Sequence, residues 1–185
     1  VLRSVRSVYV SYDRNYSNIG IRGFGRPGDF NTRVLLLVDG HRMNDNLYGS
    51  ALLGREAAVD VDLIERVEVV RGPSSSIYGN SAFFGVINVI TKQGKDINGA
   101  EASFEGGSWD TYKGRFTLGK QFTNGLALVL SGTIYDSAGQ SRLYFKEFDN
   151  AASNFGKAEH SDGEYSRSVL GKLGYNDFTL SAAYS

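Results

Sequence analysis

The chain has 185 residues with 20 basic and 20 acidic side chains, so its formal net charge is zero, which argues against nucleic-acid binding through bulk positive charge. It has no cysteine, which excludes disulfide scaffolds and Cys-ligated zinc or iron–sulfur centres, and its two histidines are too few for a histidine-rich metal site. The 23 glycines, 11 tyrosines, 11 phenylalanines and only two prolines are typical of a β-rich protein with many tight turns.

The first half of the chain, to about residue 92, alternates short apolar runs with loops rich in Gly, Asn and Asp. The apolar runs occupy residues 5–10, 19–21, 34–38, 67–70 and 86–90. The last three are continuous, as expected for strands that are buried on both faces. We predict a compact α+β domain here.

Two short helical pieces are predicted between these strands. Residues 60–66 begin with acidic side chains, which favour a helix N-terminus. Pro73 precedes residues 74–78, and we predict one helical turn there because proline is favoured near a helix start.

The second half of the chain alternates apolar and polar residues with a period of two. In one segment, Leu128, Leu130 and Ile134 share a face opposite Ser131 and Thr133. The predicted strands are residues 99–106, 111–121, 126–135, 165–175 and 178–185. This pattern predicts a meander of antiparallel strands.

The connections between these strands are of two kinds. Tight turns are predicted at residues 122–125 and 175–177, whereas residues 136–163 form a long polar loop that falls at the other end of the strands. The aromatic residues near strand ends are Tyr112, Tyr135, Tyr165, Tyr175 and Phe178. These features together are typical of an outer-membrane barrel with an interfacial aromatic girdle. For any single strand, a soluble sheet with one buried face is the commoner explanation of the alternation.

Five short motifs follow one another in the first half. They are Ile21-Arg22-Gly23-Phe24, Leu36-Leu37-Val38-Asp39-Gly40, the run from Ile64 to Pro73, Ile77-Tyr78-Gly79, and the run from Gly85 to Lys92. In this order and spacing, followed at once by alternating strands, they resemble the plug domain of TonB-dependent outer-membrane receptors. The resemblance covers nearly the whole chain.

The resemblance implies a fold in two parts. An α+β plug domain with its N-terminal part missing (about 1–94) is followed by the first four to five antiparallel transmembrane strands (about 98–185) of an incomplete barrel of the type with about 22 strands. It places the protein in the bacterial outer membrane, in contact with lipid. It implies no catalytic residues and no resident cofactor. We expect the chain to begin inside the plug, so the TonB box that TonB pulls is not visible.

The implied function is TonB-energised uptake of a scarce solute, with TonB and its inner-membrane energising complex as partner. A ferric siderophore is favoured, because the loops are aromatic and basic and because an iron chelate is the commonest cargo in the family. Cobalamin, haem or a sugar remain open as ligands. A passive porin or adhesin with an N-terminal plug, and a soluble β-rich binding or enzymatic domain, remain open as rival classes.

The resemblance also assigns a plug–barrel lock. The arginines of the Arg-Gly motifs, here Arg22 and Arg71, are expected to contact glutamates on the inner barrel wall, because an unpaired buried charge costs several kcal/mol. The alternative is that one of them pairs with Glu68 within the plug.

Ligand contacts are expected from three apical plug loops, residues 13–18, 25–31 and 44–50. Their candidate residues are Arg14, Tyr16, Arg26, Asp29, Phe30 and Tyr48. The long loop adds Arg142, Tyr144, Phe145 and Phe148. Arginine and aromatic side chains suit an anionic, partly aromatic chelate through charge-assisted hydrogen bonds and cation–π contacts. The alternative is ordinary solvated loop composition.

Glu105 and Lys113 are predicted to be cross-strand neighbours that face the lumen, where a hydrated pair contributes at most about 1 kcal/mol. His41 follows an Asp-Gly turn, and a polar turn residue explains it better than a haem ligand does. The sequence contains neither a Gly-x-Ser-x-Gly elbow nor a phosphate-binding Gly-x-x-x-x-Gly-Lys run.

Overall fold

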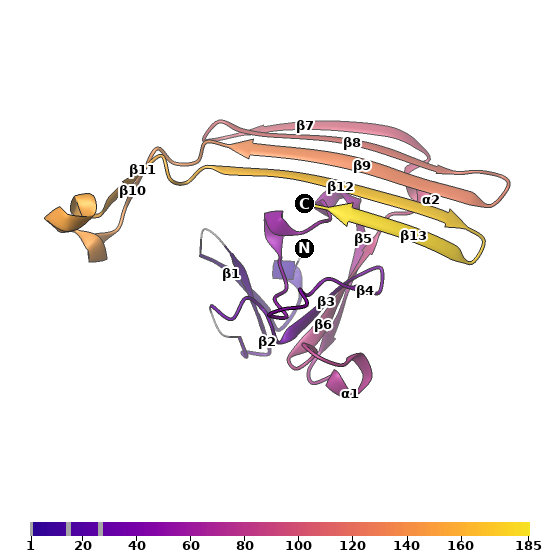
Figure 1. The fold of residues 1–185 in the computed structure, drawn as a ribbon, viewed down its shortest axis with the longest axis horizontal. Coiled ribbons are helices and arrows are strands. Elements are labelled where there is room, and N and C mark those ends of the chain that lie inside the picture. Colours follow the sequence, from indigo (N-terminus) through magenta and orange to yellow (C-terminus); the bar gives the residue numbers. More distant parts are fainter. Residues whose placement is uncertain (1, 14–15, 26–27) are drawn as a thin grey trace. The chain divides into compact units, whose positions relative to one another are not determined.

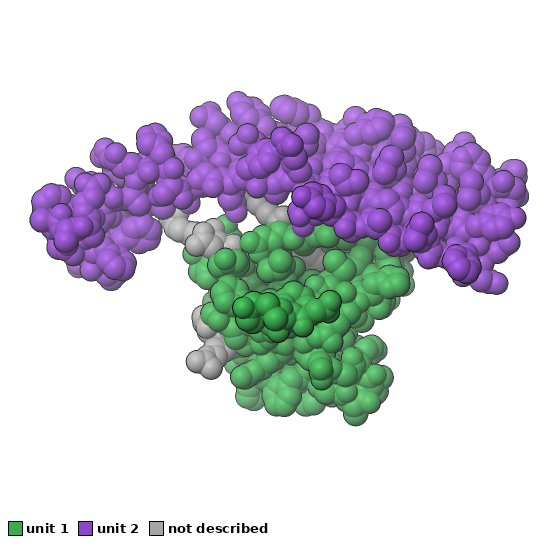
Figure 2. All heavy atoms as spheres, in the orientation of Figure 1, with its two compact units in different colours: residues 1–92 green, residues 93–185 purple. Residues whose placement is uncertain are grey.

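The computed structural model describes residues 2–13, 16–25 and 28–185. The chain divides into two compact units, unit 1 (Val1–Lys92) and unit 2 (Gln93–Ser185), which Figure 2 shows in different colours. Unit 1 mixes short helices with a small sheet, and unit 2 is built on one antiparallel sheet, so the predicted succession of an α+β domain and a strand meander is confirmed.

Unit 1 contains a mixed four-stranded sheet of order β4-β3-β6-β5 and a separate hairpin of β1 and β2 (Figure 1). The strands are β1 (Val8–Tyr12), β2 (Ser17–Ile21), β3 (Val34–Val38), β4 (His41–Arg42), β5 (Ile64–Arg71) and β6 (Gly85–Thr91). β3 runs parallel to β6, whereas β4 and β5 pair antiparallel with their neighbours. The first strand begins three residues later than its apolar run.

The central strand β3 is buried on both faces, as its continuous apolar run predicts. Val34 and Leu36 belong to a core cluster that includes Ile87 of β6 and residues of β2. Leu35 and Leu37 point to the opposite face, where they form a second cluster with alanine and valine side chains. The pleat of one strand therefore supplies both halves of the core.

The Asp-Gly turn after β3 is tied to the end of β6. The carboxylate of Asp39 accepts hydrogen bonds from the Thr91 backbone N–H at 2.9 Å and from the Thr91 hydroxyl at 2.8 Å. The Gly40 N–H donates to the side-chain oxygen of Asn88 at 3.1 Å. Gly40 has φ +82, so this position of the motif requires glycine for its backbone conformation.

The helix predicted at residues 60–66 is wrong beyond Leu63. The structure has only a 3-10 turn, η3 (Val61–Leu63), which starts at the N-cap Asp60, and β5 then begins at Ile64. The acidic start does cap this turn, as predicted. Beyond it, pairing of residues 64–71 with strand β6 is more favourable than a local helix. The single turn predicted after Pro73 is confirmed as α1 (Ser75–Tyr78). Two further 3-10 turns are η1 (Leu2–Ser4) and η2 (Gly54–Glu56).

Unit 2 is a five-stranded antiparallel sheet of order β13-β12-β9-β8-β7 (Figure 1). The strands are β7 (Gly99–Gly107), β8 (Thr111–Gln121), β9 (Leu126–Ser137), β12 (Glu164–Tyr175) and β13 (Phe178–Tyr184). All five predicted strands are confirmed, with ends within two residues. Within the described part of the chain, β7 and β13 are edge strands, so the sheet is open.

The connections also follow the prediction. The β8–β9 and β12–β13 turns lie at one end of the sheet, and the long segment between β9 and β12 extends from the other end (Figure 1). This segment is not structureless. It contains β10 (Arg142–Tyr144) paired with β11 (Lys157–Glu159), and between them η4 (Lys146–Phe148) and η5 (Ala151–Gly156). Strands of three residues are too short to show a period in the sequence.

A short helix, α2 (Gly94–Ile97), precedes the sheet. The Gln93 N–H donates to the Asp96 carboxylate at 2.8 Å at its start, and Asn98 ends it with φ +42. The helix packs against β8 and β9. Gly94 is buried there because its backbone lies against main-chain carbonyl groups of the sheet.

We expect Gly94→Ala to lower the unfolding temperature of the full-length protein. A Cβ at this position meets the Lys120 carbonyl oxygen at 2.5 Å and the Leu128 carbonyl oxygen at 2.7 Å, and backbone cannot move aside as a side chain can. Overpacking of this kind costs about 1–3 kcal/mol. Gly106→Ala is the matched control, since its Cβ meets nothing within 4 Å. Equal unfolding temperatures for the two variants contradict the packing of α2.

Candidate functional site

The two faces of the unit 2 sheet have the reverse polarity of a soluble sheet. On β9, Leu130 is 47% exposed and Ile134 is 55% exposed, whereas Ser131 and Thr133 are 2% and 8% exposed. In a water-soluble protein the apolar side chains of an alternating strand are buried and the polar ones are exposed. The structure therefore confirms which side chains share each face and shows the apolar face outermost.

This apolar face extends over all five strands. Its exposed members include Phe104, Tyr112, Phe116, Leu118, Leu128, Leu130, Ile134, Tyr165, Val169, Leu173, Tyr175, Phe178, Leu180 and Tyr184. A continuous apolar surface of this extent is foreign to a soluble monomer and matches the lipid-facing side of barrel strands. One predicted girdle residue is wrong: Tyr135 alternates with Ile134 and so lies on the polar face, half-buried.

None of the helices in the described residues is both long and apolar enough to cross a membrane.

The polar face carries paired charges and a hydroxyl ladder. The predicted cross-strand pair is present, with 3.5 Å between Lys113 Nζ and Glu105 Oε1. Two residues along, Arg115 Nη1 donates to the Thr117 hydroxyl at 2.7 Å and lies 3.4 Å from a carboxylate oxygen of Glu101. The Thr117 and Ser131 hydroxyls are 2.7 Å apart on adjacent strands. The Arg115–Glu101 pair was not predicted, because its residues are 14 positions apart and lie diagonally across β7 and β8 rather than directly opposite each other.

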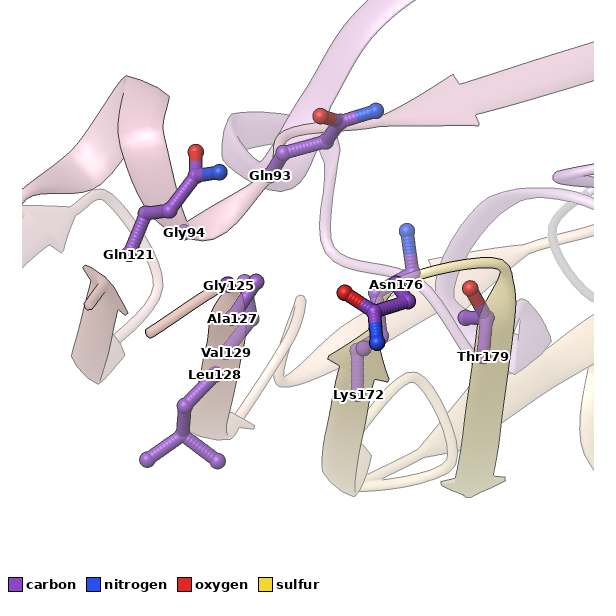
Figure 3. Close-up of a pocket in the computed structure, with 11 residues that line it drawn as sticks. Gln93, Gly94, Gln121, Gly125, Ala127, Leu128, Val129, Lys172, Asn176 and Thr179 are labelled. Atoms are coloured by element: carbon purple, nitrogen blue, oxygen red, sulfur yellow. The ribbon is translucent and has the colours of Figure 1, made fainter. Parts of the chain in front are cut away.

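A cavity of about 300 Å³ lies in unit 2 at the end that carries the tight turns (Figure 3). Polar side chains of Gln93, Gln121, Lys172, Asn176 and Thr179 line it. None of the residues predicted to bind ligand contributes to it.

In unit 1, two of the predicted ligand loops meet. Tyr16 of the β1–β2 loop and Phe30 of the β2–β3 segment form an edge-to-face ring pair, with centroids 4.9 Å apart and an interplanar angle of 88°. Asp29 accepts a hydrogen bond from the Asn31 N–H at 3.0 Å, so it stabilises the turn. The predicted ligand residues Arg14 and Arg26 lie outside the described residues.

The third loop is organised by an aspartate that the sequence analysis did not single out. The Asp45 carboxylate accepts hydrogen bonds from the backbone N–H groups of Leu47, Tyr48 and Ser50 at 2.9, 2.7 and 2.6 Å. These bonds, led by that from Tyr48, lower the pKa of Asp45 below its ordinary value of 3.8. Tyr48 itself is exposed. An Asp three residues before the aromatic position was the available signal, since aspartate commonly caps turns.

Arg22 lies in the turn after β2, and Arg71 is the last residue of β5. Arg22 has φ +53 and, with the following glycine, forms the turn after β2. Its Nη1 lies next to Gly72, where a Cβ would be 3.4 Å away. Arg71 Nη1 donates to the Arg6 carbonyl at 3.2 Å. Neither arginine has an acidic partner among the described residues.

The alternative pairing of these arginines with Glu68 is wrong in this structure. One carboxylate oxygen of Glu68 accepts from Arg66 Nε at 2.9 Å, and the other accepts from the side-chain amide of Asn88 at 3.2 Å. The bond to Glu68 raises the pKa of Arg66 above its ordinary value. Glu68 therefore bonds to side chains of β5 and β6 within the same sheet.

The long-loop candidates gather on the β10–β11 hairpin and its tip. Arg142 is paired with Glu159 across the hairpin, with 3.1 Å between Nη2 and Oε1. The Tyr144 hydroxyl donates to Asp149 at 2.7 Å, and this bond raises the pKa of Tyr144. The exposed aromatic side chains are Tyr144, Phe145, Phe148 and Phe155. The two acidic partners were missed because pairing across so irregular a loop leaves no sequence pattern.

In the described part of the chain, no three His, Cys, Asp or Glu side chains are grouped so that they could hold a metal ion.

Comparison with known proteins agrees with this arrangement. Residues 1–86 match the family model of the TonB-dependent Receptor Plug Domain. The chain is 36% identical over 142 residues to the vitamin B12 transporter BtuB of Vibrio vulnificus (strain CMCP6), a match that covers 75% of this chain and 22% of that protein. This chain thus spans about a fifth of the length of that curated relative.

Two solved structures share the fold over 98% of this chain. The ferric yersiniabactin uptake receptor FyuA from Yersinia pestis is 25% identical with a TM-score of 0.57, and the match covers 27% of that chain. The FrpB iron transporter from Neisseria meningitidis (F5-1 variant) is 20% identical with a TM-score of 0.67, and the match covers 28% of that chain.

A plug domain followed at once by outward-apolar antiparallel strands is the arrangement of a plugged outer-membrane barrel. The chain belongs to the TonB-dependent receptors. The family consists of outer-membrane transport receptors of Gram-negative bacteria and not of enzymes, so the predicted family, fold class and location are confirmed.

We expect Leu130→Lys to reduce the amount of folded full-length receptor in the outer membrane, although Leu130 is exposed in this structure. A lysine on a lipid-facing strand costs about 2–4 kcal/mol near the bilayer midplane. Heat-modifiable mobility on gels reports the folded fraction. Phe148→Lys, at an exposed position of the long loop, is the control and is expected to have no effect. Normal folding of both variants contradicts a lipid-facing Leu130.

The loop that carries Tyr48 is expected to lose stability only in acid. The folded-state pKa of Asp45 lies below 3.8, so its contribution is fully present above the unfolded pKa of about 3.9 and is lost as the pH falls through the folded value. The measurement is the difference in unfolding temperature between wild type and Asp45→Asn. This difference is expected to be constant between about pH 5 and 7 and to shrink below about pH 4. A constant difference throughout acid contradicts the role of the Asp45 charge.

Proposed function

We propose that the receptor containing this chain takes up a scarce metal chelate across the outer membrane in a step energised by TonB. The main support is that the unit 2 sheet, which directly follows a plug domain, exposes its apolar side chains and buries its polar ones. A barrel that is blocked by a plug needs an energy source to open, and the outer membrane offers none of its own. TonB, coupled to the inner membrane, supplies that energy in this family.

Ligand contact is proposed for the three plug loops and the long loop. Tyr16, Phe30 and Tyr48 offer exposed aromatic surface from the plug loops, and Phe145 and Phe148 offer it from the β10–β11 hairpin. Aromatic rings contribute large contact area at low conformational cost, which suits capture of a scarce ligand. Arg14, Arg26 and Asp29 are proposed to add charged contacts.

The plug–barrel lock remains part of the proposal. Arg22 and Arg71 have no acidic partner among the residues that the structure describes, although the Arg71 guanidinium donates to the Arg6 carbonyl and the Arg22 guanidinium lies next to Gly72. A guanidinium enclosed by a barrel needs a carboxylate partner, because an uncompensated enclosed charge costs several kcal/mol. Glutamates on barrel strands outside this chain are the proposed partners.

Two ligands are favoured by different observations. A ferric siderophore is supported by the aromatic and basic loop residues and by likeness to the ferric yersiniabactin receptor. Cobalamin is supported by the identity of 36% to a vitamin B12 transporter.

Uptake by whole cells tests the proposal. Cells that express the full-length receptor are given radiolabelled cyanocobalamin or ferric yersiniabactin, with and without TonB. We expect one probe to accumulate only when both the receptor and TonB are present. Accumulation that is independent of TonB supports a passive porin and contradicts energised uptake. Failure to bind or accumulate either probe contradicts both favoured ligands.

A further inference from the structure

The ligand loops of unit 1 converge on one buried amide. Asn31 is 4% exposed. Its Oδ1 accepts a hydrogen bond from the Ile19 N–H at 2.7 Å, and its Nδ2 donates to the carbonyls of Ser17 at 2.8 Å and Ala51 at 3.0 Å. Ser17 belongs to the first ligand loop and Ile19 follows it, and Ala51 follows the third. One side chain of the second loop therefore connects all three.

The backbone beside this amide is strained. Phe30 has φ +51 and Asn31 has φ +60, so two consecutive residues other than glycine are left-handed. Asparagine tolerates this conformation, whereas a bulky aromatic residue rarely adopts it. The Phe30 carbonyl accepts from the Ala51 N–H at 3.0 Å, and the Asn31 backbone N–H donates to the Asp29 carboxylate at 3.0 Å. The neighbouring segments thus hold the strained backbone in place.

The Phe30 ring next to this backbone is only partly buried. It contacts Tyr16 across two loops, yet Tyr16 is 38% exposed and Phe30 is 41% exposed. Aromatic rings recruited only for packing are expected to be buried, since burial is what stabilises them. Here the two touching rings lie partly in solvent beside a strained backbone, which favours a role in binding over a role in the core.

We propose that Asn31 is a positioning residue that holds Tyr16 and Phe30 as a rigid platform for a flat, conjugated ring of the ligand. This inference rests on the proposed function and adds the chemistry of one contact surface. A platform that is ordered before binding avoids the entropic cost of fixing two side chains and two loops when the ligand arrives. The two side chains remain partly exposed beside their mutual contact, which leaves surface for stacking.

The ring contacts are tested by binding to the full-length receptor on cells that lack TonB, so that binding is measured without transport. The probes are cyanocobalamin and ferric yersiniabactin. Tyr16→Leu and Phe30→Leu are each expected to weaken binding of the recognised probe about three- to tenfold, since leucine keeps apolar volume but offers no ring face. Tyr9→Leu, at an exposed tyrosine of β1, is the control and leaves binding unchanged.

The positioning role is tested by a double-mutant cycle. Asn31→Asp keeps the acceptor for Ile19 but removes both donated bonds, and we expect at least about a tenfold loss of affinity that largely disappears in the Phe30→Leu background. Asn44→Asp is the matched control, because Asn44 is equally buried and also makes three hydrogen bonds, but to Leu36, Val34 and Gly49. Its effect is expected to add to that of Phe30→Leu.

The outcomes separate the two proposals. A wild-type receptor that binds neither probe overturns the proposed ligands and this platform with them. A wild-type receptor that binds a probe, with Tyr16→Leu and Phe30→Leu binding equally well, overturns only the platform. An Asn31→Asp effect of the same size in both backgrounds overturns the positioning role. The two leucine variants alter exposed side chains, so they report on the platform even where Asn31→Asp reduces folded receptor.

Discussion

The hydrogen-bonding demand of a backbone in lipid is the constraint on which the unit 2 sheet depends. Each strand must pair its N–H and C=O groups with neighbours and place apolar side chains outward, because hydrocarbon solvates neither peptide groups nor charge. The sheet meets both conditions in its interior, where Leu130 and Ile134 face out and Ser131 and Thr133 face in. Its edges, β7 and β13, require further strands, and a barrel supplies them.

Unit 1 satisfies its polar groups by different means. Buried side-chain amides and a carboxylate connect segments that have no regular pairing: Asn31 joins the ligand loops, Asn44 joins β3 to the third loop, and Asp39 joins the Asp-Gly turn to β6. Such bonds contribute about 0.5–1.5 kcal/mol each, and leaving a buried partner unsatisfied costs more. The plug can therefore keep irregular loops ordered, which is what a preformed ligand surface requires.

The sequence predicted those features that depend on local period. The five strands, their two faces and the buried strand β3 follow from alternation and from continuous apolar runs. The sequence did not predict those features that depend on contacts between residues far apart in the chain. Pairing with β6 turned residues 64–66 from helix to strand, and the Arg142–Glu159 pair joins residues 17 positions apart. For the ligand site the sequence identified Tyr16 and Phe30 but not their contact or Asn31, because a side chain that bonds Ser17 and Ala51 carries no local signal.

The central claim is that the apolar face of the sheet contacts lipid. It is tested most directly by spin labels on the full-length receptor in lipid vesicles, with a single cysteine placed at position 130 or 131 and any cysteine outside residues 1–185, which contain none, replaced by serine. The account predicts that a label at 130 is relaxed by oxygen dissolved in the bilayer, and that a label at the adjacent position 131 is not. The opposite result, with 131 in contact with lipid and 130 shielded, contradicts the account.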